Sequence, residues 1–137
     1  MPDRLSAWGQ EMLERPLMHT TLATVSADGS PHQAVIWYTV AGDDVLVNSK
    51  RGRLWPTNLL RSGRYSLWIG DDVDWISLRG RAEALDDPAQ AREDIVDMAK
   101  RYHRDDPETI ARTSITFRGQ DRISFLLHVE AVTEHAA

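Results

Sequence analysis

The chain contains no cysteine among its 137 residues. This absence excludes disulfide bonds, thiolate metal sites and a cysteine nucleophile, and it suits a reducing compartment. No apolar run approaches the ~20 residues that a membrane-spanning helix needs. The amino-terminal residues also lack the basic region and apolar stretch of a secretory signal. We therefore expect a cytoplasmic protein that does not associate with membranes.

Positive charge is also scarce. The chain has 16 lysine and arginine residues against 21 aspartate and glutamate residues, which gives a formal net charge of −5 at pH 7. Proteins that wrap nucleic acid normally show the opposite balance. We expect no nucleic-acid partner.

Two kinds of catalytic motif are missing as well. None of the five histidines pairs with another at metal-ligand spacing, and there is no His-Glu-x-x-His run. No Gly-x-Ser-x-Gly sequence marks a serine nucleophile. The sequence therefore predicts no metal site and assigns no catalytic residue.

Short runs of β-branched or alternating apolar residues recur along the chain, separated by turn residues. They predict six strands, at His19–Val25, Gln33–Val40, Val45–Ser49, Tyr65–Ile69, Trp75–Ala84 and Ile123–Ala131. Asp28-Gly29 between the first two runs is a strong hairpin signal. We expect the first three strands to form an antiparallel meander.

Helical spacing of apolar residues predicts helices at Asp3–Arg15, Leu54–Leu60 and Ala89–Tyr102, with Pro16 ending the first. Asp106 and Pro107 can open a further short helix. The strands are grouped rather than alternating with helices, which excludes a doubly wound parallel sheet. We expect a mainly β (α+β) fold, a small closed or split β-barrel of about six antiparallel strands, with residues 1–137 as a single domain.

The stretch from Asn48 to Asn58 is the most informative for chemistry. Lys50, Arg51 and Arg53 surround Gly52 between the end of a strand and the start of a short helix. A helix N-terminus binds anions readily, and arginine grips phosphate in a bidentate way. This pattern favours a phosphate site, with Ser49 and Thr57 as hydroxyl donors. A solvated basic loop is the alternative reading.

The strand from Gln33 to Tyr38 is apolar on both faces. A planar heteroaromatic ring needs such a flat apolar wall with backbone hydrogen bonds along one edge. The strand can equally be a central core strand. The chain has five tryptophans, and we expect one or more of Trp37, Trp55 and Trp75 to lie near a ligand.

Three stretches between about Leu17 and Val132 carry a family resemblance. The first joins Leu22–Val25, Asp28–His32 and Val35–Tyr38, the second joins Gly52–Leu54, Asn58-Leu59 and Arg61–Leu67, and the third is Leu78–Ala82. In this order they resemble the pyridoxamine 5′-phosphate oxidase-like, flavin-reductase-like split β-barrels. Within that superfamily the short chain is similar to the branch that uses the deazaflavin coenzyme F-420.

The resemblance implies an F-420-dependent oxidoreductase that transfers hydride at position 5 of the deazaflavin ring. The substrate would be an apolar or conjugated small molecule. The resemblance also implies a homodimer with two cofactor sites at the subunit interface. The phosphate would bind the loop Ser49–Arg53 with Asn58 behind it, the ring would lie along His32–Trp37, and the partner subunit would contribute around Trp75. The expected cofactor-binding residues are His32, Gln33, Ala34, Val35, Ile36, Trp37, Asn48, Ser49, Lys50, Arg53, Leu54, Trp55, Asn58 and Trp75.

The sequence departs from the family pattern at three positions. Trp55 stands where many members carry a lysine, and Gln33 and Tyr38 stand where true pyridoxamine phosphate oxidases carry phosphate ligands. FMN, haem or FAD in the same groove is therefore an alternative, and so is a non-enzymatic protein that binds a cofactor or small molecule. His32 and Tyr38 are candidate proton donors.

Overall fold

The computed structural model describes residues 3–15 and 19–137. Within these ranges seven strands form one antiparallel sheet in the order β2-β1-β5-β6-β7-β4-β3. The strands are β1 (His19–Val25), β2 (Pro31–Val35), β3 (Thr39–Ala41), β4 (Asp44–Lys50), β5 (Arg64–Gly70), β6 (Trp75–Leu85) and β7 (Arg122–His135). The helices are α1 (Ala7–Glu14), α2 (Leu54–Ser62), α3 (Pro88–Tyr102) and α4 (Pro107–Arg118).

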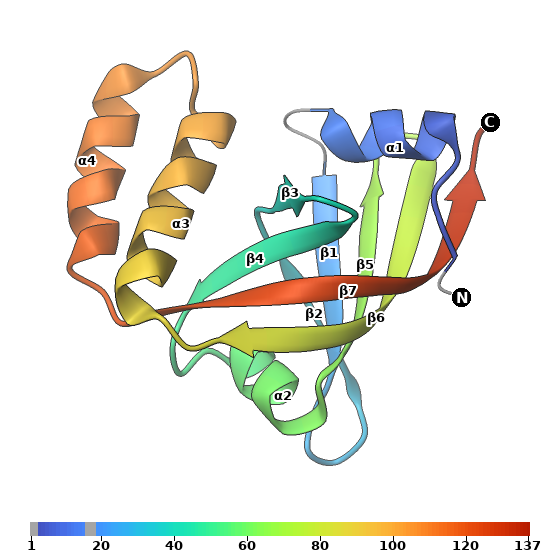
Figure 1. The fold of residues 1–137 in the computed structure, drawn as a ribbon, viewed down its shortest axis with the longest axis horizontal. Coiled ribbons are helices and arrows are strands. Elements are labelled where there is room, and N and C mark those ends of the chain that lie inside the picture. The colour runs from blue at the N-terminus through green and yellow to red at the C-terminus, as the bar shows by residue number, and fades with distance from the viewer. Residues whose placement is uncertain (1–2, 16–18) are drawn as a thin grey trace.

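The sheet curls into a split barrel, which confirms the predicted fold class. Figure 1 shows α1 over one end of the barrel, α2 at the other end, and the α3–α4 hairpin projecting to one side. None of the helices within the described ranges is long and apolar enough to span a membrane.

Alternation along the strands builds the core, as the sequence predicts for β6. Ile76 and Leu78 are fully buried, whereas Ser77 is half-buried and Arg79 is exposed on the opposite face. Burial of each such aliphatic side chain contributes about 1.5–3 kcal/mol. The inward residues of β1, β4, β5 and β7 join the same core, and α1 and α2 close it from the ends.

The expected strand Gln33–Val40 is wrong as a single element, because it is interrupted at residues 36–38. The N–H of Tyr38 donates to the Tyr102 hydroxyl (3.2 Å), and the Tyr38 carbonyl accepts from Arg101 Nη1 (2.7 Å). Side chains of α3 therefore take the backbone bonds that a neighbouring strand would make. This interruption gives seven strands rather than six.

The predicted three-stranded meander is also wrong. The β1–β2 hairpin forms, with Gly29 in a left-handed turn conformation at φ +88°. The chain then crosses the split, and β3 pairs with β4 at the opposite edge of the sheet. β4 pairs with β7 rather than with β2.

Capping residues fix the helix starts. The Ser6 hydroxyl accepts from the N–H of Gly9, so α1 begins at Ala7 rather than at the expected Asp3. Asp87 and Asp106 cap α3 and α4 in the same way, each followed by a proline. The expected end of the first helix at Pro16 lies outside the described residues.

Gly80 lies at a β-bulge where the pairing of β6 with β7 shifts register. A Cβ at this position would lie far inside contact distance of the His128 carbonyl oxygen. We expect Gly80→Ala to lower the free energy of unfolding by about 1–3 kcal/mol through overpacking. Urea denaturation measures this. Gly119→Ala is the control, because its Cβ would meet Thr116 O at 3.6 Å; equal losses in both variants would contradict the account.

Candidate functional site

The end of β4 and the loop that follows it carry three cations, Lys50, Arg51 and Arg53. Gly52 has a left-handed backbone with φ +91°, which residues with a side chain rarely adopt. Arg51 forms an ion pair with Asp121 (Nε to Oδ1, 3.4 Å), and its N–H donates to the Asp121 carbonyl. Lys50 and Arg53 form no ion pair with any residue of the described ranges. The loop therefore presents two unpaired positive charges.

Helix α2 begins directly after this loop. Arg53 is its N-cap residue, and no side chain caps the helix. The N–H groups of the first turn, including those of Leu54 and Trp55, have no partner inside a helix, and they carry a partial positive charge. Leu54 is 49% exposed, whereas Trp55 is 5% exposed and packs against Phe125 with ring centroids 6.2 Å apart. Trp55 is thus part of the core.

A buried polar network lies beneath the loop. Asn48 is 6% exposed; its Nδ2 donates to the Ala91 carbonyl (2.8 Å) and to Ser124 Oγ (2.9 Å). Its Oδ1 accepts from Arg122 Nε (2.9 Å), and Ser124 in turn donates to Asp94 Oδ2 (2.7 Å). Asn48 therefore links β4 to β7 and to α3 through hydrogen bonds to other residues of the chain.

Ser49 and Asn58 are also fully buried. The Ser49 hydroxyl donates to the Lys50 carbonyl (2.9 Å). Asn58 Nδ2 donates to Thr24 Oγ1 (3.0 Å), and its Oδ1 accepts from Arg61 Nη1 (3.1 Å). These two residues position the loop and α2 from within; a direct cofactor contact for either stays a prediction.

The predicted ring wall divides into two parts. On β2, His32 and Ala34 are half-buried, whereas Gln33 is exposed and Val35 is 83% exposed. Ile36 belongs to the core and is 9% exposed. The structure thus leaves the outer face of β2 uncovered within the described residues.

Trp37 lies in an aromatic cluster with the α3–α4 hairpin. Its ring stacks on Tyr102 (centroids 5.1 Å apart, interplanar angle 11°). His103 and Phe117 meet it edge-on at 5.2 Å and 6.3 Å. Stacked and edge-on contacts of this kind hold the ring in a fixed orientation.

Tyr38 is enclosed and is not placed to give a proton to a ligand. Its hydroxyl donates to the Leu13 carbonyl (2.6 Å), and its side chain is fully buried. Burial raises the pKa of Tyr38 to about 12. His32 is left as the candidate proton donor.

Trp75 lies on the outer face of the sheet, far along the chain from the loop. Its ring is half-buried and stacks on His135 (centroids 5.3 Å apart, interplanar angle 16°). Trp68 belongs to the same face, since a Cβ on Gly70 would touch both the Trp68 ring and Trp75. No ring contact within the described residues joins Trp75 to Trp37 or Trp55.

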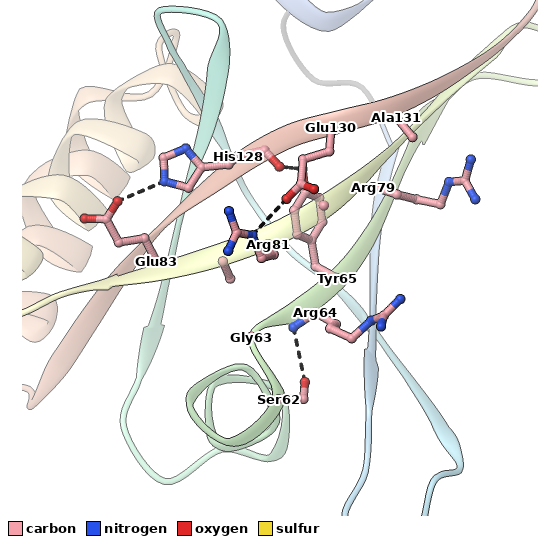
Figure 2. Close-up of a pocket in the computed structure, with 12 residues that line it drawn as sticks. Ser62, Gly63, Arg64, Tyr65, Arg79, Arg81, Glu83, His128, Glu130 and Ala131 are labelled. Carbon is pink, nitrogen blue, oxygen red and sulfur yellow. Dashed lines mark hydrogen bonds and ion pairs between the residues drawn. The ribbon is translucent and has the colours of Figure 1, made fainter. Parts of the chain in front are cut away.

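A separate open cavity of about 900 Å³ lies on β5, β6 and β7. Figure 2 shows the Arg81–Glu130 ion pair and the His128–Glu83 hydrogen bond within it. His128 also contacts Asp44, Nδ1 to Oδ2 at 3.1 Å, so both ring nitrogens face carboxylates. None of the fourteen expected cofactor-binding residues lines this cavity.

Three residues near the loop and the ring were missed by the sequence reasoning: Arg122, Phe117 and Tyr102. The guanidinium of Arg122 lies 5.0 Å from the centre of the Phe117 ring. Arg122 shares a face of β7 with Ser124, and alternation with Ile123 and Phe125 predicts that this face points outward. The sequence held one signal for Tyr102: the apolar face of α3, which includes this residue, has to pack against another part of the chain.

The chain resembles known proteins at the level of sequence family and of fold. A family model described as pyridoxamine 5′-phosphate oxidase matches residues 10–135. No curated protein matches the chain. Among solved structures, a conserved hypothetical protein from Mycobacterium tuberculosis is 20% identical, with TM-score 0.76 over 97% of this chain and 86% of that one.

Two further solved structures carry functional names. A protein called F-420 reductase is 20% identical, with TM-score 0.74 over 94% of this chain and 98% of that one. A heme binding protein from Mycobacterium smegmatis is 18% identical, with TM-score 0.67 over 96% of this chain and 55% of that one. At these identities the likeness supports the fold.

The carboxylates beside His128 generate a prediction about pH. The hydrogen bond that His128 makes to the Glu83 carboxylate, and then that to Asp44, raise the pKa of His128 above its usual value of about 6.5. This contact therefore stabilises the fold fully below about pH 6.5, the unfolded value. The contribution is lost as pH rises through the folded pKa. Chemical denaturation of wild type and His128→Gln from pH 5.5 to 8.5 should give a stability difference that shrinks with rising pH; a constant difference would contradict the assignment.

Proposed function

The chain belongs to the pyridoxamine 5′-phosphate oxidase family, and from this premise we propose that it is an oxidoreductase that uses the deazaflavin coenzyme F-420. Membership supports an oxidoreductase or flavin-binding function. The F-420 reductase among the similar folds supports the choice of cofactor. When bound, the deazaflavin supplies hydride transfer to a small-molecule substrate, so no protein nucleophile is required.

The observation that carries this proposal is the unpaired charge of Lys50 and Arg53 beside the α2 N-terminus. A phosphate-bearing cofactor fits this place, because Lys50 and Arg53 have no carboxylate partner within the described residues and no side chain caps the first-turn N–H groups of α2. Arg53 can form a bidentate contact with phosphate, whereas Lys50 supplies a point charge.

The aromatic cluster around Trp37 supports a ring site nearby. Trp37 is half-buried and held by Tyr102 and His103. It therefore offers a flat apolar surface of fixed orientation for a planar heteroaromatic ring. His32, half-buried on the adjoining β2, is the group of this chain that we assign to proton transfer with the substrate.

We also propose that the protein is a homodimer with its cofactor sites between the subunits. Members of this fold family are generally dimers that bind their cofactor at the interface. The outer face of β2, β1, β5, β6 and β7 supports this, because a row of direct cross-strand partners on it contains no charged side chain. The row consists of Val35, Thr21, Trp68, Ser77 and Thr133. Val35, at the end of this row, is 83% exposed. The partner's copy of this face would bring Trp75 to the cofactor.

The cofactor assignment predicts a specific binding pattern. Titration of the purified protein with F-420 and with FMN, followed by tryptophan fluorescence, should give saturable quenching by F-420 and weaker quenching by FMN. A preference for FMN would move the function to flavin chemistry on the same fold. Binding of neither, or binding of haem alone, would contradict the proposal.

Arg53→Ala should weaken F-420 binding by about 1.5–3 kcal/mol, roughly ten- to a hundred-fold, because a charge-assisted bond to phosphate is lost. Arg64→Ala is the matched control, since Arg64 is exposed and lines the separate cavity of Figure 2. Unchanged affinity in Arg53→Ala would remove the loop from the cofactor site.

The dimer predicts the effect of a charge placed in the outer face. Ser77→Arg should give a monomer in sedimentation velocity and should weaken F-420 binding at least tenfold, because an unpaired charge at an interface core is costly. Ile115→Arg is the control, because Ile115 is 76% exposed on α4. A Ser77→Arg variant that remains dimeric would contradict this choice of face.

A further inference from the structure

Arg122, the first residue of β7, is a buried cation without an anion. Arg122 is 4% exposed, and no carboxylate of the described ranges forms an ion pair with it. Nε donates to Asn48 Oδ1 (2.9 Å) and Nη1 donates to Gln120 Oε1 (2.8 Å), and both acceptors are neutral amides. Because a buried charge is costly unless an opposite charge accompanies it, this environment lacks a negative group.

Other cations gather around the same point. Lys50 is the direct cross-strand partner of Arg122, so both side chains leave the same face of the sheet. Like charges in this arrangement destabilise a sheet. Burial, and then the positive charge of Arg53, lower the pKa of Arg122 to about 10. Asp121, the adjacent carboxylate in sequence, is already paired with Arg51.

Phe117 of α4 joins this cationic cluster to the aromatic one. The Arg122 guanidinium lies 5.0 Å from the centre of the Phe117 ring, a cation–π distance. The same ring meets Trp37 edge-on at 6.3 Å. One phenyl ring therefore separates the unpaired guanidinium from the flat surface of Trp37.

We propose that Arg122 lies at the buried end of an anion site that it shares with Lys50 and Arg53. This site binds the phosphate of the cofactor, and Trp37 contacts the cofactor ring. The inference rests on the proposed function and deepens it, because it adds a buried binding residue from β7 at the phosphate end of the ligand. A phosphate among these cations would supply the missing opposite charge. Arginine suits the role, since its planar fork can bind two phosphate oxygens while Nε holds Asn48.

The test compares ligands that differ only in phosphate. Isothermal titration measures FMN against riboflavin, and F-420 against its phosphate-free deazaflavin chromophore, for wild type, Arg122→Gln and Arg53→Gln. We expect each variant to lose at least tenfold in affinity for the phosphorylated ligand and less than twofold for its phosphate-free counterpart. Arg64→Gln, in the cavity of Figure 2, is the control and should lose neither.

Each alternative outcome is distinct. Equal losses for both ligands of a pair would mean that Arg122 acts only through structure, and would overturn the inference. Should Arg122→Gln fail to fold, Arg53→Gln decides by the same comparison. Should wild type bind none of these cofactors, the proposed function fails, and titration with inorganic phosphate followed by ³¹P NMR decides the anion site alone. Phosphate binding that is lost in Arg53→Gln supports the site, and absence of binding overturns it.

Discussion

Arg101 and Tyr102 of α3 hydrogen-bond the carbonyl and the N–H of Tyr38, and the Tyr38 hydroxyl donates to Leu13 beneath α1. These three bonds hold one residue of the chain at the split of the barrel, away from any strand. The β1–β2 hairpin is therefore left at one edge of the sheet, and β3 and β4 begin the other edge beside β7. Trp37, the residue before Tyr38, therefore lies outside the strands and packs against α3 and α4. Phe117 of α4 contacts both Trp37 and Arg122, and so connects this point of the chain to the end of the sheet that carries the cationic loop.

A second constraint is the balance of charge around that loop. The protein is acidic overall, yet Arg122 has Lys50 as its cross-strand partner and lies near the positive charge of Arg53. Asp121, the carboxylate next to Arg122 in sequence, is paired with Arg51. Asn48 orients Arg122 from below and is itself held by Ser124 and α3. Such a network places a guanidinium rigidly, which is what binding a small anion requires. By contrast, the cavity in Figure 2 contains its own counter-charges, since Arg81 pairs with Glu130 and His128 bonds to Glu83.

The sequence predicts much of the fold because its local signals agree with tertiary packing. Asp28-Gly29 makes the expected turn, Asp87-Pro88 starts the expected helix, and Ile76 and Leu78 point inward as their alternation predicts. The break at Tyr38 could not be predicted, because its cause is 63 and 64 residues away on α3. The candidate site is harder to predict from the sequence for the same reason. Lys50 and Arg53 are readable as a basic loop, but nothing local marks Arg122 as their neighbour, because strand pairing between β4 and β7 brings it there. Trp55 shows the opposite case: its place beside the loop suggests a ligand contact, whereas its ring is buried against Phe125 in the core, and a contact with the cofactor stays a prediction.

Our proposal places the phosphate of the cofactor at Arg122 rather than in the cavity of β5, β6 and β7. The arginine Nε–Hε groups of ¹⁵N-labelled protein report this directly, with each signal assigned from an arginine-to-lysine variant. On titration with F-420 the account predicts that the Arg122 signal shifts with saturation while those of Arg64 and Arg79 do not move. Shifts at Arg64 or Arg79 with an unmoved Arg122 signal would place the ligand in the cavity of Figure 2 and would contradict the account.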